Sequence, residues 1–105
     1  PFDIDSHDSF ISEDTTCCTS IEKDKMRIIL NHDFVDNFRI KHPNKQEYSW
    51  WDYRGRAFYQ NKGMRIDSVI SSINTLPFLQ NCFIDSGARE QDKPSDHAPV
   101  ITIYS

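Results

Sequence analysis

A stiff loop that leads into a strongly β-forming run constrains the fold of this chain more than any other feature. Pro94 and Pro99 favour extended backbone at the residues before them, so residues 93–99 have little conformational freedom. Residues 100–104 follow as an expected strand, in which Ile101 and Ile103 share one face while Val100, Thr102 and Tyr104 share the other. The loop is therefore expected at the end of a β-strand, where folds commonly present reactive side chains.

Periodicity and turn residues predict the other elements. Ser20 is expected to cap one main helix over 21–31, and a short element over 34–38 is ended by Pro43. The remaining elements are expected to be strands at 48–53, 65–72 and 79–86, a loop at 54–63, a short helix or turn at 73–78, and an acidic, Ser/Thr-rich loop at 1–20. This order predicts an α+β fold of mostly antiparallel strands with one main helix.

Composition excludes several classes of protein. The 105 residues suffice for one small domain, and seven Phe, four Tyr and two Trp are too many for a disordered coil. A net charge of −4 argues against nucleic-acid binding by the surface as a whole, so any DNA contact needs a local basic patch or a metal ion. No apolar run approaches the roughly 20 residues of a membrane span. Cys17, Cys18 and Cys82 lack a zinc-binding spacing and are expected to be reduced thiols in the cytoplasm.

Asp96 and His97 stand side by side in the stiff loop. A carboxylate is a hard oxygen ligand that suits Mg²⁺ or Mn²⁺. An imidazole can donate a hydrogen bond to a phosphoryl oxygen or act as an acid or base. The pair is a candidate site, and an ordinary surface pair is the alternative.

Asp67 interrupts an apolar strand candidate that contains Ile66, Val69 and Ile70. An acid at such a position has to face solvent, pair with another group or serve a function. Pairing with a histidine would fix the tautomer and orientation of the ring. A water-facing residue on an edge strand is the alternative.

Residues 50–65 combine aromatic and basic side chains. Five aromatic residues lie between positions 50 and 59, and four basic residues with no acid lie between Asp52 and Asp67, which gives a local charge of +4. Basic groups suit phosphates, and aromatic rings suit unstacked bases or a sugar face. The stretch predicts a DNA contact, with a core strand and a solvated loop as the alternative.

Three segments resemble exonuclease III–type abasic-site endonucleases in their order and spacing. They are Tyr-Ser-Trp-Trp-Asp-Tyr-Arg-Gly at 48–55, Asn-Lys-Gly-Met-Arg-Ile-Asp at 61–67, and Lys-Pro-Ser-Asp-His-Ala-Pro-Val at 93–100. The segment Phe-Val-Asp-Asn-Phe-Arg at 34–39 shares the resemblance, which extends from about residue 21 to the end. Ser-Asp-His before the last strand is common to the wider endonuclease/exonuclease/phosphatase superfamily. The other segments resemble a much narrower group, the exonuclease III–type enzymes.

The resemblance implies a DNA repair nuclease with abasic-site endonuclease and 3′-exonuclease activities, which hydrolyses phosphodiesters with Mg²⁺ or Mn²⁺. In such an enzyme His97 would contact the scissile phosphate, Asp67 would orient His97, and Asp96 would lie at the metal. Its partner would be double-stranded DNA with abasic sites or 3′ ends. The residues expected at the DNA and the abasic pocket are Trp50, Tyr53, Arg54, Lys62, Met64 and Arg65.

The family's fold is a DNase I-like four-layer α/β sandwich, and the chain resembles its C-terminal half only, with the motifs in 21–105. The metal-binding glutamate and other groups of the family's N-terminal half have no counterpart, since Gln46-Glu47 follows a polar turn and does not fit that motif. Residues 1–105 alone are therefore expected to be nearly inactive and to expose an apolar sheet face that a complementary N-terminal half would cover. The alternatives are a non-catalytic, DNA-contacting remnant and another phosphodiesterase of the superfamily.

Overall fold

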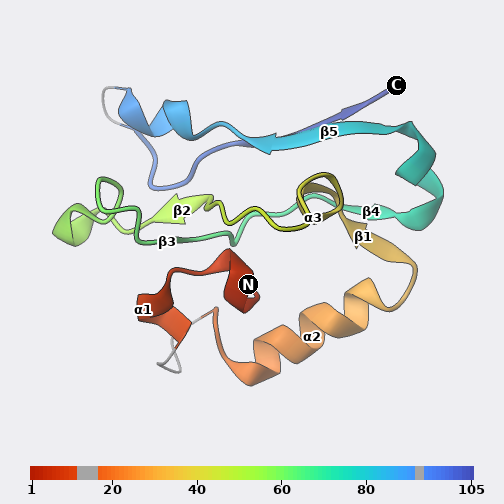
Figure 1. Ribbon diagram of the computed structural model, residues 1–105, viewed down its shortest axis with the longest axis horizontal. Helices are drawn as coiled ribbons and strands as arrows, with labels where there is room; N and C mark the ends of the chain where they lie inside the picture. The colour runs from red at the N-terminus through yellow and green to blue at the C-terminus, as the bar shows by residue number, and fades with distance from the viewer. Residues whose placement is uncertain (12–16, 92–93) are drawn as a thin grey trace.

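The computed structural model describes residues 1–11, 17–91 and 94–105, so Lys93 of the proline-bracketed loop lies outside the described residues. In Figure 1, β5 and the C-terminal strand run along one side, α2 runs along the other, and β2, β3 and β4 lie between them. The helices are α1 (Asp8–Ile11), α2 (Ser20–Leu30) and α3 (Asn37–Lys41), and the strands are β1 (Phe34–Asp36), β2 (Trp50–Trp51), β3 (Gly63–Met64), β4 (Ile70–Ser72), β5 (Leu79–Ile84) and β6 (Val100–Tyr104). Short 3-10 turns lie at Asp3–Asp5, Arg54–Arg56, Ile73–Phe78 and Ser86–Glu90.

The strands form antiparallel pairs, in which β1 pairs with β4, β2 with β3, and β5 with β6. The predicted α+β fold with antiparallel strands and one main helix is confirmed. No helix within the described residues is long and apolar enough to cross a membrane.

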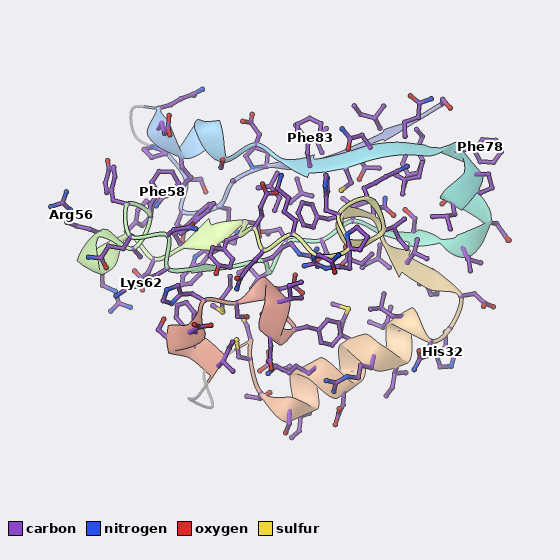
Figure 2. The ribbon with its side chains drawn as sticks, in the orientation of Figure 1. His32, Arg56, Phe58, Lys62, Phe78 and Phe83 are labelled. Atoms are coloured by element: carbon purple, nitrogen blue, oxygen red, sulfur yellow. The ribbon has the colours of Figure 1, made fainter. Side chains whose placement is uncertain are left out.

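The β5–β6 pair has an inner and an outer face. Cys82, opposite Thr102, is fully buried, whereas Ile101 and Ile103 on the alternate positions remain exposed. Figure 2 labels Phe83, which pairs with Ile101 and belongs to this outer face. The predicted alternation of β6 is confirmed, and it leaves an apolar outer face, which we define as Phe83, Ile101 and Ile103.

Helix α2 begins one residue earlier than the sequence suggests. The prediction that Ser20 is the cap is wrong, because Ser20 is already helical and the hydroxyl oxygen of Thr19 accepts the backbone N–H of Glu22. The Thr19 hydroxyl also donates to the Glu22 carboxylate at 2.8 Å. The Thr19 oxygen satisfies one of the unpaired N–H donors at the start of the helix, and the contact with Glu22 holds its side chain in place, which favours Thr19 as the cap.

Three predicted strands are shorter in the structure. The aromatic strand expected at 48–53 is paired only at 50–51, the strand expected at 65–72 only at 70–72, and the strand expected at 79–86 only at 79–84. The gap between β3 and β4 has a physical cause. The Arg65 side chain turns into the interior to meet two carboxylates, so the chain leaves the β3 pairing after Met64.

The expectation that residues 1–20 are loop is also wrong for part of that segment. A 3-10 turn and α1 lie within it, and Asp5 and Ser6 are only 2% and 1% exposed. Ser6 forms a β-bridge with Met64, and the backbone N–H of His7 donates to the carbonyl of Gly63 at 2.9 Å. The first residues therefore pack against β3 rather than projecting into solvent.

The ion cluster of Asp5, Asp36, Arg39 and Arg65 joins these segments. The Arg65 guanidinium donates to Asp5 at 2.8 Å and to both carboxylate oxygens of Asp36 at 3.0 and 2.6 Å, and Arg39 also donates to Asp5. Burial opposes the charged form of Arg65, but its hydrogen bonds to Asp36 and Asp5 outweigh burial and raise its pKa. Buried charges persist only when such partners compensate their lost hydration.

We predict that Arg65→Met lowers the free energy of unfolding by about 3 kcal/mol, because it leaves Asp36 without its buried partner. Arg27→Met is the matched control, since Arg27 pairs with Asp24 on the exposed side of α2 and surface pairs contribute about 0.5 kcal/mol. Urea unfolding of both variants measures the difference. Equal losses for the two variants would show that the ion cluster does not stabilise the fold.

Candidate active site

His97 and Asp67 form a hydrogen-bonded pair. His97 Nδ1 lies 2.7 Å from a carboxylate oxygen of Asp67, although 30 positions separate them in sequence. Their side chains are 42% and 40% exposed, so the pair is open to an incoming molecule. When Nδ1–H donates to Asp67, Nε2 is left as the nitrogen that can exchange a proton or contact a phosphate.

Backbone hydrogen bonds fix the loop that carries His97 against β2. Trp50 and His97 form an isolated antiparallel bridge. The N–H of Trp51 donates to the carbonyl of Asp96 at 3.1 Å, and the N–H of Ala98 donates to the carbonyl of Ser49 at 2.7 Å. The backbone on both sides of His97 is therefore tied to the same segment.

Asp96 lies beside the pair but supplies little for a cation by itself. One of its carboxylate oxygens accepts the indole N–H of Trp50 at 3.0 Å, and the other lies 4.0 Å from His97 Nε2. No group of three or more His, Cys, Asp or Glu side chains gathers as a metal cage in the described part of the chain. Mg²⁺ prefers near-octahedral oxygen ligands, so Asp96 can offer one ligand but these residues do not form a complete site.

A pocket of about 400 Å³ is lined by Ile66, which precedes Asp67 in the chain, and by Trp50, whose indole N–H donates to Asp96. Trp50 and Met64 face each other across the β2–β3 pair and form one wall. The pocket is also lined by Phe10, Cys17, Asp52 and Arg54. Its size and its apolar walls suit a small group such as a sugar ring.

Gly63 keeps the two strands behind this pocket in close contact. A Cβ atom at Gly63 would lie 2.6 Å from the backbone oxygen of Trp50, a distance that real Cβ atoms do not show. Only glycine therefore allows the backbone approach that sets Met64 opposite Trp50.

The aromatic and basic loop contacts the loop that carries Asp96 and His97. The Tyr53 hydroxyl donates to the carbonyl of Pro94 at 2.7 Å. Arg89 joins the same contact, because its guanidinium lies over the rings of Phe58 and Tyr53 at 4.8 and 5.4 Å and donates to the carbonyl of Ser95 at 3.1 Å. The position of the Asp96-His97 loop therefore depends partly on the loop predicted to bind DNA.

The basic side chains of that loop differ in their availability. Figure 2 shows Arg56 and Lys62 at the end of the molecule opposite Phe78. Arg54 is highly exposed, but its guanidinium donates to Asp52 at 2.8 Å. A phosphate would have to compete with the Asp52 carboxylate for Arg54.

The structure contradicts the predicted DNA contact of Arg65. Arg65 is 3% exposed, and its guanidinium hydrogen bonds go to Asp5 and Asp36. The local charge that the sequence presents to solvent is therefore smaller than +4. Arg65 therefore stabilises the fold through buried ion pairs and is not available to a ligand at the surface.

Sequence reasoning missed two residues of the site. Ser49 is completely buried, and its hydroxyl accepts the N–H groups of Ile66 and Asp67. Phe10 of α1 lines the pocket, although its segment was expected to be loop. A polar residue inside the aromatic run 48–53 was a usable signal for Ser49, whereas the position of Phe10 follows only from packing against β3.

Sequence comparison finds related DNA repair nucleases. No protein-family model matches the chain. Exodeoxyribonuclease III of Haemophilus influenzae is 34% identical over 73 residues, which are 69% of this chain and 27% of that protein.

Two groups of solved structures cover the whole chain. The 3′ phosphatase NExo from Neisseria, bound to a product DNA hairpin, matches with a TM-score of 0.93 at 32% identity. An AP endonuclease from Archaeoglobus fulgidus matches with a TM-score of 0.89 at 29% identity. Each match takes in 100% of this chain and 41% of the other, so the chain has the DNase I-like fold of these nucleases and spans less than half of their length.

The pair of Asp52 and Arg54 generates a pH prediction. The side-chain hydrogen bond from Arg54, followed by that from its backbone N–H, lowers the pKa of Asp52 from 3.8 to about 2. A lowered pKa means that the pair is intact above pH 3.8 and is lost as the pH falls through about 2. Carboxyl carbon NMR should show this titration, and Arg54→Ala should raise the pKa part of the way to 3.8 because the backbone bond remains. An unchanged titration in Arg54→Ala would exclude the side chain as its cause.

Proposed function

Because the chain is related to exodeoxyribonuclease III and to AP endonucleases, we propose that it forms part of a nuclease that hydrolyses DNA phosphodiesters at abasic sites and 3′ ends. The observation that carries this proposal is the Asp67–His97 hydrogen bond beside the pocket of Trp50 and Met64. The oriented imidazole could act on a phosphate, and the pocket has room for a sugar ring.

In the proposed reaction, His97 contacts the scissile phosphate through Nε2 while Asp67 holds the ring by Nδ1. A protonated imidazole can donate from both nitrogens, so it can stabilise negative charge on a phosphoryl oxygen while the carboxylate balances the imidazolium. The exposure of the pair supports access for a DNA strand. Asp67 is the positioning group, and His97 is the group that touches the substrate.

The pocket and the basic loop define the proposed DNA contact. Trp50 and Met64 would receive an extrahelical abasic sugar, which is smaller than a nucleotide that keeps its base. Tyr53, Arg54 and Lys62 would contact phosphates beside that sugar. Arg65 has no part in this contact, because it is buried in the ion cluster.

We propose that Mg²⁺ or Mn²⁺ belongs to the complete site and that Asp96 supplies one ligand to it. The cation would offset negative charge at the phosphate. Since the described residues offer no cage of three ligands, the other ligands have to come from water, substrate phosphates or another polypeptide segment.

A complementary segment is the proposed partner of the apolar outer face. Phe83, Ile101 and Ile103 line one side of β5–β6, where Ile101 and Ile103 are 37% and 44% exposed. The related structures have more than half of their length outside the matched region. The segment that corresponds to this remainder, predicted to be N-terminal, would cover the face and complete the metal site. We propose a cytoplasmic location, which the three free thiols support.

The first prediction concerns activity. The chain alone should cleave an abasic-site duplex negligibly in Mg²⁺, and addition of the complementary segment of a related nuclease should restore cleavage, because it supplies the absent ligands. In that complex His97→Ala should lower cleavage by about 10³-fold or more with DNA binding retained.

His32→Ala is the matched control, because His32 lies at the end of α2, far from the loop of Arg56 and Lys62 in Figure 2. It should leave cleavage at the level of the parent. Association without cleavage would favour the alternative of a non-catalytic, DNA-contacting remnant. Full activity of His97→Ala would refute the assignment of His97.

The second prediction concerns the DNA surface. Lys62→Ala should reduce the slope of log affinity against log salt by about 0.9, the value for one lost phosphate contact. Arg54→Ala should reduce it by less, because Asp52 already compensates the Arg54 charge. Fluorescence anisotropy with an abasic duplex at several salt concentrations measures the slopes. Lys25→Ala on α2 is the control, and an equal slope change there would show that only net charge matters.

A further inference from the structure

Ser49 lies at the junction of the segments that carry Asp67 and His97. It immediately precedes β2 and is completely buried. Its backbone N–H donates to the carbonyl of Met64 at 3.0 Å, which continues the β2–β3 pairing. Ser49 therefore belongs to the rigid part of the fold, although neither its side chain nor its backbone touches the pocket.

The hydroxyl of Ser49 holds the segment of Asp67. Its oxygen accepts the backbone N–H of Ile66 at 3.1 Å and that of Asp67 at 3.0 Å. This segment lies outside the regular strands, so its backbone groups have no ladder partner at these positions. One side-chain oxygen thus replaces the strand pairing that the chain loses after Met64.

The carbonyl of the same residue holds the segment of His97. The N–H of Ala98 donates to the Ser49 carbonyl at 2.7 Å, directly after His97. Asp67 and His97 are therefore attached to one buried residue, each through the peptide group at or next to its own position. The side chains of Asp67 and His97 then meet in a hydrogen bond of 2.7 Å.

We propose that Ser49 is a positioning residue that sets the separation of Asp67 and His97 and thereby fixes the tautomer of the His97 imidazole. The proposal rests on the function proposed above only in giving the Asp67–His97 pair a catalytic role. Without the hydroxyl oxygen, two backbone N–H groups lose their acceptor, and the 66–67 segment has to move to find another. A displacement of about 1 Å at Asp67 would be enough to weaken its hydrogen bond to His97.

The test is side-chain ¹⁵N NMR of His97 in the complete 105-residue chain. In the parent, Nδ1 should show the shift of a protonated nitrogen and Nε2 that of an unprotonated one at a pH where the ring is neutral. Ser49→Ala should move both shifts toward those of a free histidine, in which the two tautomers exchange. Ser49→Thr keeps the hydroxyl oxygen and should restore the shifts of the parent.

Ser71→Ala is the matched control for the loss of a buried hydroxyl. Ser71 lies on β4, and its hydroxyl hydrogen-bonds Tyr104 instead of the site. It should lower stability without moving the His97 shifts. If Ser49→Ala does not fold, Ser49→Cys gives the same comparison, because sulfur is a weaker acceptor and should shift the signals part of the way.

The outcomes separate the inference from the proposed function. A fixed tautomer in the parent that persists in Ser49→Ala or Ser49→Cys would overturn the role of Ser49 and leave the Asp67–His97 pair intact. Equal changes in the Ser49→Ala and Ser71→Ala variants would overturn it as well, since they would indicate general loosening. Free-histidine shifts already in the parent would overturn the pair itself, and with it both the inference and the proposed function.

Discussion

The buried ion cluster around Arg65 is the interaction on which the rest of the structure depends. Arg65 reaches Asp5 from the first turn and Asp36 from the end of β1, so it joins three segments that are distant in sequence. A guanidinium is buried only when carboxylates compensate its lost hydration, and here two of them do. The same turn of the chain that buries Arg65 ends β3 and releases residues 66–69 from regular pairing. Asp67 lies in this released segment, so the ion cluster that joins these segments also places an acid where it can meet His97.

The candidate site is built from irregular backbone held by a few specific bonds. Residues 94–99 are fixed by the bridge to Trp50 and by the contacts of Tyr53 and Arg89 with the loop. The opposite segment is fixed by the Ser49 hydroxyl. Loops are normally the mobile parts of a fold, and here short hydrogen bonds to buried groups restrain them. The side chains that face solvent are therefore oriented by groups that do not face it, which is the arrangement that an oriented histidine requires.

Local sequence patterns predicted the elements whose formation depends on neighbours in the chain. The main helix, the proline-bracketed loop and the alternation of β6 follow from capping, steric and period-2 rules, although the cap is Thr19 and not the expected Ser20. The other failures are non-local. Residues 1–20 looked polar and solvated, but Asp5 is buried because Arg65, 60 positions away, needs its carboxylate. The strand expected at 65–72 begins only at Ile70, because Arg65 turns inward after β3. The positive charge counted for the basic loop was too large, since Arg65 points inward and Arg54 is paired with Asp52.

The sequence by itself determined which chemical groups are present and in what order: an aromatic, basic stretch at 50–65, an acid that interrupts an apolar strand candidate, and an Asp-His pair in a stiff loop. These follow from residue identity and spacing, which set local backbone preferences. Only the tertiary structure decided that Asp67 meets His97 at 2.7 Å, that Trp50 faces Met64 beside a pocket, and that Arg65 is turned away from solvent. The reason is physical: these contacts join residues far apart along the chain, and their geometry depends on how buried charges and backbone hydrogen-bond donors are satisfied together, which no single segment determines.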